Sequence, residues 1–391
     1  MTTHKRLVFP DIKPRFEGTG VPAGFVNDVR GWTFTRPQVE EAAREKKLLT
    51  LDVDLAGKGS CSLGCSHCFR RGDDFAKEER MDRGTLIKHL QEAKTLGLRT
   101  VKIIGPGEPL EEKGLLDFLR TLREMDITPL IFTKGHVLGD DALAQRIHGM
   151  SSRELCAQLK ALDVSILLGT TSFDPTIESS FVGRDGYHAR RDAAIRLLDE
   201  FGFNEFIPGQ PTRLAFICTP ITPMNVDEVF DIYVFARTHN IQPVFAPTMV
   251  AGRALGKLLG LIPDEEALLD LYVKINLWNI EHGRTTIEEI ESTGVTAYAG
   301  GAPCNQVAVG MFIRGTGDVL RCPGNGASFQ GNLDEKSLTE IWVKSENLNQ
   351  FAGKYNCGCP AKEGISFPDN FFEKVMARLK EVLGSQPGDN S

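Results

Sequence analysis

The sequence predicts an α/β protein: an open parallel sheet or a partial (β/α)6 barrel, followed by a small α+β domain. Between residues 48 and 250, six short apolar runs alternate with amphipathic stretches whose apolar residues recur every three or four positions. Such alternation gives right-handed βαβ units and a parallel sheet, and six repeats fall short of the eight that close a full barrel. After about residue 250 the pattern changes. We therefore expect an extension (1–47), a core (48–250) and a C-terminal domain (251–391).

The expected strands are the apolar runs at 48–55, 100–105, 128–133, 163–170, 213–219 and 242–248. The expected helices lie at 82–97, 113–125, 151–162, 191–202, 225–240 and 261–283. Later in the chain, VAVGMFI and DVLRC flank the turn sequence RGTGD, which predicts a β-hairpin, and residues 331–342 lead through another helix. Residues 15–37 are rich in Gly and Pro and predict a loop-like segment that could serve as a lid.

Composition excludes several classes of protein. The chain has 391 residues and a net charge of −7, which argues against a bulk nucleic-acid binder. No apolar run has the length of a signal peptide or of a membrane span. Nine cysteines without a secretion signal make a disulfide framework a poor explanation. We expect a cytoplasmic protein with reduced thiols and neither membrane nor nucleic acid as partners.

Three of these thiols are crowded into CSLGCSHCF, residues 61–69, directly after the first strand. Cys61, Cys65 and Cys68 cannot all pair with one another, but they can bind one ion or cluster. A zinc site would need a fourth ligand, which His67 could supply. A [4Fe-4S] cluster on three cysteines would leave one iron open. The spacing favours the cluster and leaves zinc as the alternative.

A second signal follows the next strand, where IIGPGEPL (103–110) places a Gly-Glu-Pro turn. The CxxxCxxC loop, Phe69 after it and this turn together resemble the radical S-adenosylmethionine (radical SAM) superfamily over about residues 48–250. The resemblance implies a partial barrel with a [4Fe-4S] cluster on Cys61, Cys65 and Cys68. It also implies that the amino and carboxylate groups of SAM chelate the fourth iron.

The resemblance assigns further residues to SAM binding: Phe69, Gly105, Gly107, Glu108, Pro109, Thr133, Ser172 and Arg184. It implies that the backbone at Gly107 holds the methionine amino group, although Pro106 stands where the family usually has its first Gly. Thr133, in FTKG, would lie near the ribose, although this chain has Lys134 where relatives often have Asn. Ser172 would contact ribose or carboxylate, and Arg184 the carboxylate. The alternatives are a turn cap for Ser172 and a solvated helix start for Arg184.

Four later cysteines, Cys304, Cys322, Cys357 and Cys359, surround the expected hairpin and the helix after it. Seen alone, two unequal pairs could form a zinc site. Behind a radical SAM core they resemble a shortened SPASM/Twitch domain, which implies one auxiliary [4Fe-4S] cluster. The closing Cys-x-Cys departs from the more usual Cys-x-x-Cys, so the fourth ligand stays open.

The resemblance implies an enzyme that reductively cleaves SAM to a 5′-deoxyadenosyl radical, which removes a hydrogen atom from a substrate. Electrons would come from a reductase such as flavodoxin or ferredoxin. Because residues 1–47 are short for a peptide-recognition domain, we expect a small-molecule substrate, such as a sugar or natural-product intermediate, and net oxidation. The alternatives are epimerisation with Cys218 as hydrogen donor, peptide modification, and a non-catalytic iron-sulfur scaffold or sensor. Core packing explains Cys156, and it competes with the donor role for Cys218.

Overall fold

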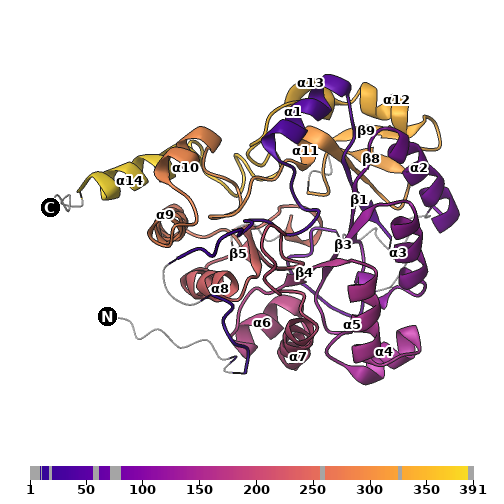
Figure 1. Ribbon diagram of the computed structural model, residues 1–391, viewed down its shortest axis with the longest axis horizontal. Helices are drawn as coiled ribbons and strands as arrows, with labels where there is room; N and C mark the ends of the chain where they lie inside the picture. Colours follow the sequence, from indigo (N-terminus) through magenta and orange to yellow (C-terminus); the bar gives the residue numbers. More distant parts are fainter. Residues whose placement is uncertain are drawn as a thin grey trace.

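The computed structural model describes residues 9, 11–16, 20–55, 61–70, 81–255, 260–324 and 328–385. At its centre is a nine-stranded sheet with the order β6-β5-β4-β3-β2-β1-β7-β8-β9 (Figure 1). The first six strands are parallel and neighbour one another in chain order. They are β1 (Thr50–Asp54), β2 (Thr100–Gly105), β3 (Thr128–Thr133), β4 (Ser165–Gly169), β5 (Leu214–Ile221) and β6 (Gln242–Pro247). All six expected strands are thus confirmed, in the parallel arrangement of a partial (β/α)6 barrel.

Helices connect successive strands and cover the sheet. They are α2 (Arg83–Thr95), η2 (Pro109–Glu111), α3 (Leu115–Glu124), α4 (Asp141–His148), α5 (Ser152–Ala161), α6 (Pro175–Val182), α7 (Tyr187–Glu200) and α8 (Val226–Thr238). The sequence analysis missed α4 and α6, which are short helices begun by aspartate caps. Asp140 accepts from the Leu143 amide, and Asp174 accepts from the amides of Thr176 and Ile177.

The C-terminal third adds to the same sheet. The expected hairpin is confirmed: β7 (Gly310–Ile313) and β8 (Asp318–Leu320) are antiparallel, and β9 (Phe329–Asn332) follows. β7 pairs in parallel with β1, with Gly310 opposite Thr50, so the sheet continues past residue 250. The remaining elements are η3 (Gly252–Ala254), α9 (Glu265–Glu281), α10 (Ile287–Thr293), α11 (Gln306–Val309), α12 (Leu338–Val343), α13 (Glu346–Phe351) and α14 (Phe371–Ser385). The division into three domains stays a prediction.

The N-terminal segment fills the barrel from one end. Val29 and Trp32 pack with inward-facing residues of β3 to β6, among them Leu130 and Leu167. A side chain at Gly31 would meet Leu130, Thr128 and Thr100, and both threonines begin strands. This part of the expected lid therefore covers the amino ends of the strands, opposite the loops after their carboxyl ends. Residues 17–19 of the 15–37 segment lie outside the described residues.

The helix α1 (Arg36–Glu45) continues from this segment and contacts α11 in the C-terminal third (Figure 1). It has Pro37 in its first turn and a capping box made by Thr35 and Gln38. The largest hydrophobic cluster joins the sheet to its helices and extends to α9, α12 and α14. Within the described residues, none of the helices combines the length and apolar character that crossing a membrane requires.

Candidate active site

The cysteine loop follows β1 and is held against the carboxyl end of α6. The Gly64 amide donates to the Val182 carbonyl at 3.0 Å, and the Ser66 amide donates to the Phe181 carbonyl at 3.2 Å. A side chain at Gly183, whose φ is +65°, would lie 2.9 Å from the Gly64 carbonyl oxygen. The close approach of the two segments therefore requires glycine at residue 183.

Ser62, between the first two predicted iron ligands, is bound by three other loops. Its Oγ donates to Glu111 Oε1 at 2.5 Å, and its amide donates to Oε2 at 2.8 Å. The same Oε1 lies 2.7 Å from His136 Nε2. Arg184 Nη1 donates to the Oγ and the carbonyl of Ser62, at 2.8 and 3.1 Å. Arg184 thus fixes the cysteine loop in this structure, and its contact with a SAM carboxylate stays a prediction.

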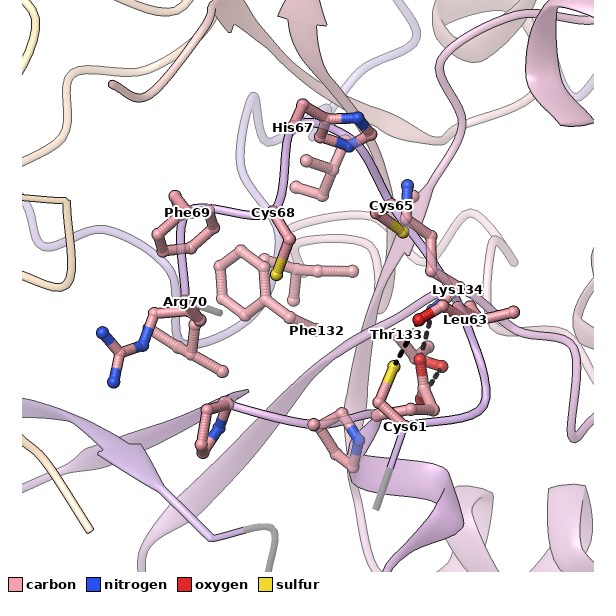
Figure 2. A pocket seen from close by; sticks show the side chains of 18 of the residues that line it. Cys61, Leu63, Cys65, His67, Cys68, Phe69, Arg70, Phe132, Thr133 and Lys134 are labelled. Carbon is pink, nitrogen blue, oxygen red and sulfur yellow. Dashed lines mark hydrogen bonds between the residues drawn. The ribbon is translucent and has the colours of Figure 1, made fainter. Parts of the chain in front are cut away.

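Cys61, Cys65 and Cys68 are free thiols that line one pocket, and their sulfur atoms face the same hollow in Figure 2. Burial raises the pKa of Cys61 to about 12 and also raises the pKa of Cys65, which the Lys134 ammonium partly offsets. Such thiols become thiolates only beside compensating positive charge, which iron would supply. No group of three or more His, Cys, Asp or Glu side chains within the described ranges is arranged to hold one metal ion.

His67, the zinc-site alternative, also lines this pocket. Burial lowers its pKa well below the usual value, so the ring is neutral. The ring packs edge-on against Phe181, at 5.6 Å between centroids. Its Nδ1 is buried and has no hydrogen-bond partner within the described part of the chain.

The turn after β2 brings Gly107, Glu108 and Pro109 into the same pocket. Gly105 has a φ of +152°, and a side chain there would approach the nitrogen and oxygen of Gly107 to 3.3 and 3.2 Å. The peptide bond between Gly105 and Pro106, where the family usually has Gly, is cis. Gly107 itself lines the pocket.

Both oxygens of the Glu108 carboxylate accept hydrogen bonds from other residues of the protein. Its Oε1 accepts from Thr133 Oγ1 at 2.5 Å and from the Leu110 amide at 3.1 Å, and its Oε2 accepts from the Lys134 amide at 2.8 Å. Burial raises the pKa of Glu108, while His136 and these hydrogen bonds act in the opposite direction. Glu108 therefore ties the loop after β2 to the loop after β3, and Thr133 enters the pocket as part of this link.

Four residues predicted for SAM binding or catalysis are not among the residues that line this pocket: Gly105, Ser172, Cys218 and Arg184. Ser172 is buried and its Oγ donates to Glu228. Cys218 is also buried, with its Sγ 3.7 Å from the Thr171 carbonyl oxygen, and burial raises its pKa well above the usual value. Arg184 binds Ser62, as described above. Their assigned roles stay predictions.

A second cavity adjoins the first. Both are lined by Phe69, Ile104, Phe132, Ile217 and Thr219. Cys304, Cys322 and Cys359 line the second cavity, whereas Cys357 does not and its Sγ lies 3.2 Å from the Lys354 carbonyl oxygen. Burial raises the pKa of Cys322 to about 12 and that of Cys359 to about 11. Three of the four predicted auxiliary ligands therefore line one cavity, and their binding of a shared cluster stays a prediction.

Sequence reasoning missed several polar residues in these cavities. Lys134 lines the first cavity, and a side chain at Gly169 would lie 2.9 Å from its Nζ. Asp52, Lys102 and Lys362 line the second and are almost completely buried. The sequence does contain a signal for two of them, because Asp52 in LTLDVD and Lys102 in TVKIIG are charged residues inside apolar strands.

The comparisons agree with this geometry at the level of the fold. No protein-family model and no curated protein matches the sequence, but 57 chains of solved structures match. SuiB from Streptococcus suis bound to precursor peptide SuiA matches with a TM-score of 0.56 and 18% identity, over 86% of this chain and 79% of that chain. SuiB bound to S-adenosylmethionine matches with a TM-score of 0.52 and 19% identity, over 86% and 81%. This chain has the fold of radical SAM enzymes.

Proposed function

We propose that the protein is a radical SAM enzyme in which Cys61, Cys65 and Cys68 hold a [4Fe-4S] cluster that binds SAM. The observation that carries this proposal is the single pocket shared by the three thiols, the Gly107 turn and Thr133. These groups follow β1, β2 and β3, whose carboxyl ends are adjacent in the sheet. When bound, the cluster and SAM supply a 5′-deoxyadenosyl radical that removes a hydrogen atom from the substrate.

The protein's own contribution is to orient the bound groups and to exclude water. Glu108 and Ser62 each join two or more loops, so the thiols and the turn are held together before SAM binds. The shared wall of the two cavities is largely apolar and contains Phe69, Ile104, Phe132 and Ile217. A dry wall of this kind protects a reactive species from side reactions.

The second cavity is the proposed substrate site, and an auxiliary [4Fe-4S] cluster would be held by Cys304, Cys322 and Cys359, which line this cavity, together with Cys357. A reductase such as flavodoxin or ferredoxin would deliver the first electron. Net oxidation is favoured over epimerisation because the Cys218 thiol is buried and lies outside the residues that line either cavity. The product of oxidation would be lighter than the substrate by two hydrogen atoms.

Two substrate classes remain candidates. Val29 and Trp32 of the N-terminal segment pack against the sheet, so this part offers no free peptide-recognition surface, which supports a small molecule. The match to SuiB in its complex with the precursor peptide SuiA supports a peptide. A substrate of either class would place one C–H bond in the second cavity. The residues that line this cavity would therefore contact a small molecule or a peptide alike.

Anaerobic reconstitution with iron and sulfide, followed by reduction with dithionite in the presence of SAM, tests the proposal. We expect about eight irons per chain, as two cubane clusters require, and release of 5′-deoxyadenosine detected by mass spectrometry. A protein that binds iron but releases no 5′-deoxyadenosine would support the scaffold or sensor alternative. Zinc at the C-terminal cysteines would exclude the auxiliary cluster.

A further inference from the structure

A pair of opposite charges lies inside the second cavity. Asp52 on β1 and Lys102 on β2 stand directly opposite each other in the parallel register. They are 4% and 2% exposed, and both line the cavity. Charged side chains are rarely this buried unless they pair with an opposite charge or bind a ligand. The hydrogen-bond partners of Lys102 and Asp52 distinguish these two roles.

The Lys102 ammonium is well satisfied. Its Nζ donates to Gln306 Oε1 at 2.7 Å and lies 4.7 Å from the centroid of the Trp32 ring. Gln306 cannot readily turn its amide around, because its Nε2 donates to the Met311 carbonyl at 3.1 Å. Lys102 is thus directed toward Gln306 and the indole.

Asp52 is not satisfied in the same way. Its Oδ1 lies 3.9 Å from Lys102 Nζ, beyond hydrogen-bond distance, and this buried atom has no hydrogen-bond partner among the residues that the structure describes. Burial raises the pKa of Asp52 to about 6, against the opposing effect of Lys102. An unpaired buried carboxylate oxygen is costly, so an ion pair with a purely structural purpose would be expected to close this gap.

A carboxylate two residues away shows what a structural role looks like on the same strand. Asp54 faces the same side of β1 and binds Arg70 through both oxygens, at 2.5 and 3.3 Å. It also accepts from the Gly315 amide at 3.2 Å. The Asp54 carboxylate is therefore bound by other groups of the protein, whereas Asp52 lines the cavity and has an oxygen that no described residue binds.

We propose that Asp52 recognises the substrate by accepting a hydrogen bond from a neutral O–H or N–H group, which makes it a specificity-determining residue. The inference rests on the proposed function, because it takes the second cavity as the substrate site. A neutral donor fits best, since Lys102 would repel a second cation near Oδ1 and Asp52 itself would repel an anion. Much of the cavity wall is apolar, including Phe132, Val244 and Met249, and Lys362 is a second cation in the lining. The substrate group is therefore a hydroxyl or amide carried on an apolar body.

Probes that share one ring and differ in the polar group test this recognition. The reconstituted full-length protein is titrated with 4-methylbenzyl alcohol, its methyl ether and 4-methylbenzylamine, and binding is followed by ligand-observed saturation-transfer NMR. The alcohol should bind about tenfold more tightly than the ether or the amine, the effect of one hydrogen bond to a charged acceptor. Equal binding of alcohol and ether, or no binding of the alcohol, would overturn the proposal.

Two substitutions sharpen the test. In Lys102→Met the repelling cation is gone, so the amine should become the preferred probe, a gain that an unfolded protein cannot mimic. In Asp52→Leu the alcohol should lose its preference over the ether. Lys274→Met is the matched control, because the Lys274 ammonium also lies over an aromatic ring, Phe230 at 3.9 Å, but outside the residues that line the cavity. The control should keep the wild-type order of probes.

Different results would contradict the role of Asp52 and the proposed cleavage of SAM. Release of 5′-deoxyadenosine is measured on the same preparations and reports only the SAM site. If SAM is cleaved but Lys102→Met leaves the probe order unchanged, Asp52 is not the recognition residue. If the probe order follows the prediction without any SAM cleavage, the polar group is recognised but the proposed reaction is wrong.

Discussion

The first three cysteines lie within residues 61–68 of one loop, whereas the C-terminal cysteines are spread between residues 304 and 359. The first group is set by local spacing. It is then held by the bonds of Ser62 to Glu111 and Arg184 and by the Gly64 and Ser66 amides, which donate to carbonyls at the end of α6. The second group depends on the pairing of β7 with β1, which carries the hairpin to the core. The difference explains why the first site has a recognisable motif and the second has a weaker one.

The two groups also differ in charge. Burial raises the pKa values of cysteines in both groups, but the charged neighbours differ. Glu108 and Glu111 raise the pKa of Cys61 further, whereas the Lys362 ammonium lowers that of Cys359. Only a positively charged partner such as iron would make Cys61 a thiolate, although each group has one protein cation beside another of its thiols, Lys134 at Cys65 and Lys362 at Cys359. The predictions below test whether the two sites are independent.

The largest expected effect comes from removing the second site. In Cys304→Ser combined with Cys322→Ser, iron should fall from about eight to about four per chain, because one of two cubanes loses its ligands. Product formation should stop while release of 5′-deoxyadenosine continues, as measured by iron analysis and mass spectrometry. Loss of SAM cleavage in this variant, with the first cluster still present by electron paramagnetic resonance, would show that the sites are not independent.

A smaller effect is expected at the pocket wall of the first site. Gly107→Val would place a side chain where the backbone meets the methionine amino group, so SAM affinity should fall by about tenfold, or 1.4 kcal/mol. Iron content should stay at the wild-type level. Gly260→Val is the control, because a side chain there meets no atom within 4 Å. Unchanged SAM affinity, measured by equilibrium dialysis, would refute the assignment of the turn.

The smallest effect concerns the Ser62 contacts. Burial raises the pKa of Glu111, but hydrogen bonds from His136 and Ser62 lower it more, so the pKa lies below its usual value. The stability gained is present above the pKa of the unfolded chain and is lost as the pH falls through the lower folded pKa. Glu111→Gln should therefore lower the free energy of unfolding of the metal-free protein by about 1 kcal/mol at neutral pH and by less in acid.

Denaturant titrations of wild type and Glu111→Gln at neutral and at acidic pH measure this difference in the free energy of unfolding. Asp117→Asn is the control, because its carboxylate is 79% exposed in a surface pair with Arg120, and such pairs contribute little. A Glu111→Gln effect that does not shrink in acid would mean that hydrogen bonds to the ionised carboxylate are not its cause.

Much of the fold could be predicted because its signals are local. Each expected strand was a short apolar run bounded by helix patterns, and the structure matches these runs to within a few residues. The convergence of the cysteine loop, the Gly107 turn and Thr133 also follows from sequence, since consecutive parallel strands place their carboxyl ends side by side.

The rest depended on partners that are distant in the chain. Nothing near Ser172 indicates that its hydroxyl donates to Glu228, and nothing near Arg184 indicates Ser62. The parallel pairing of β7 with β1 joins residues 260 positions apart, as Gly310 and Thr50 show. Asp52 and Lys102 were hidden because each lies within an apolar run, and only the register brings them together.

The central claim is that Cys61, Cys65 and Cys68 hold the cluster that cleaves SAM. The most direct test is the rate of 5′-deoxyadenosine release, under dithionite and without added substrate, from wild type and from the variant with all three cysteines changed to Ala. The account predicts measurable release from wild type, none from the variant, and retention of about four irons at the second site. Release from the variant at the wild-type rate, or a wild-type protein that binds SAM and never cleaves it, would contradict the account.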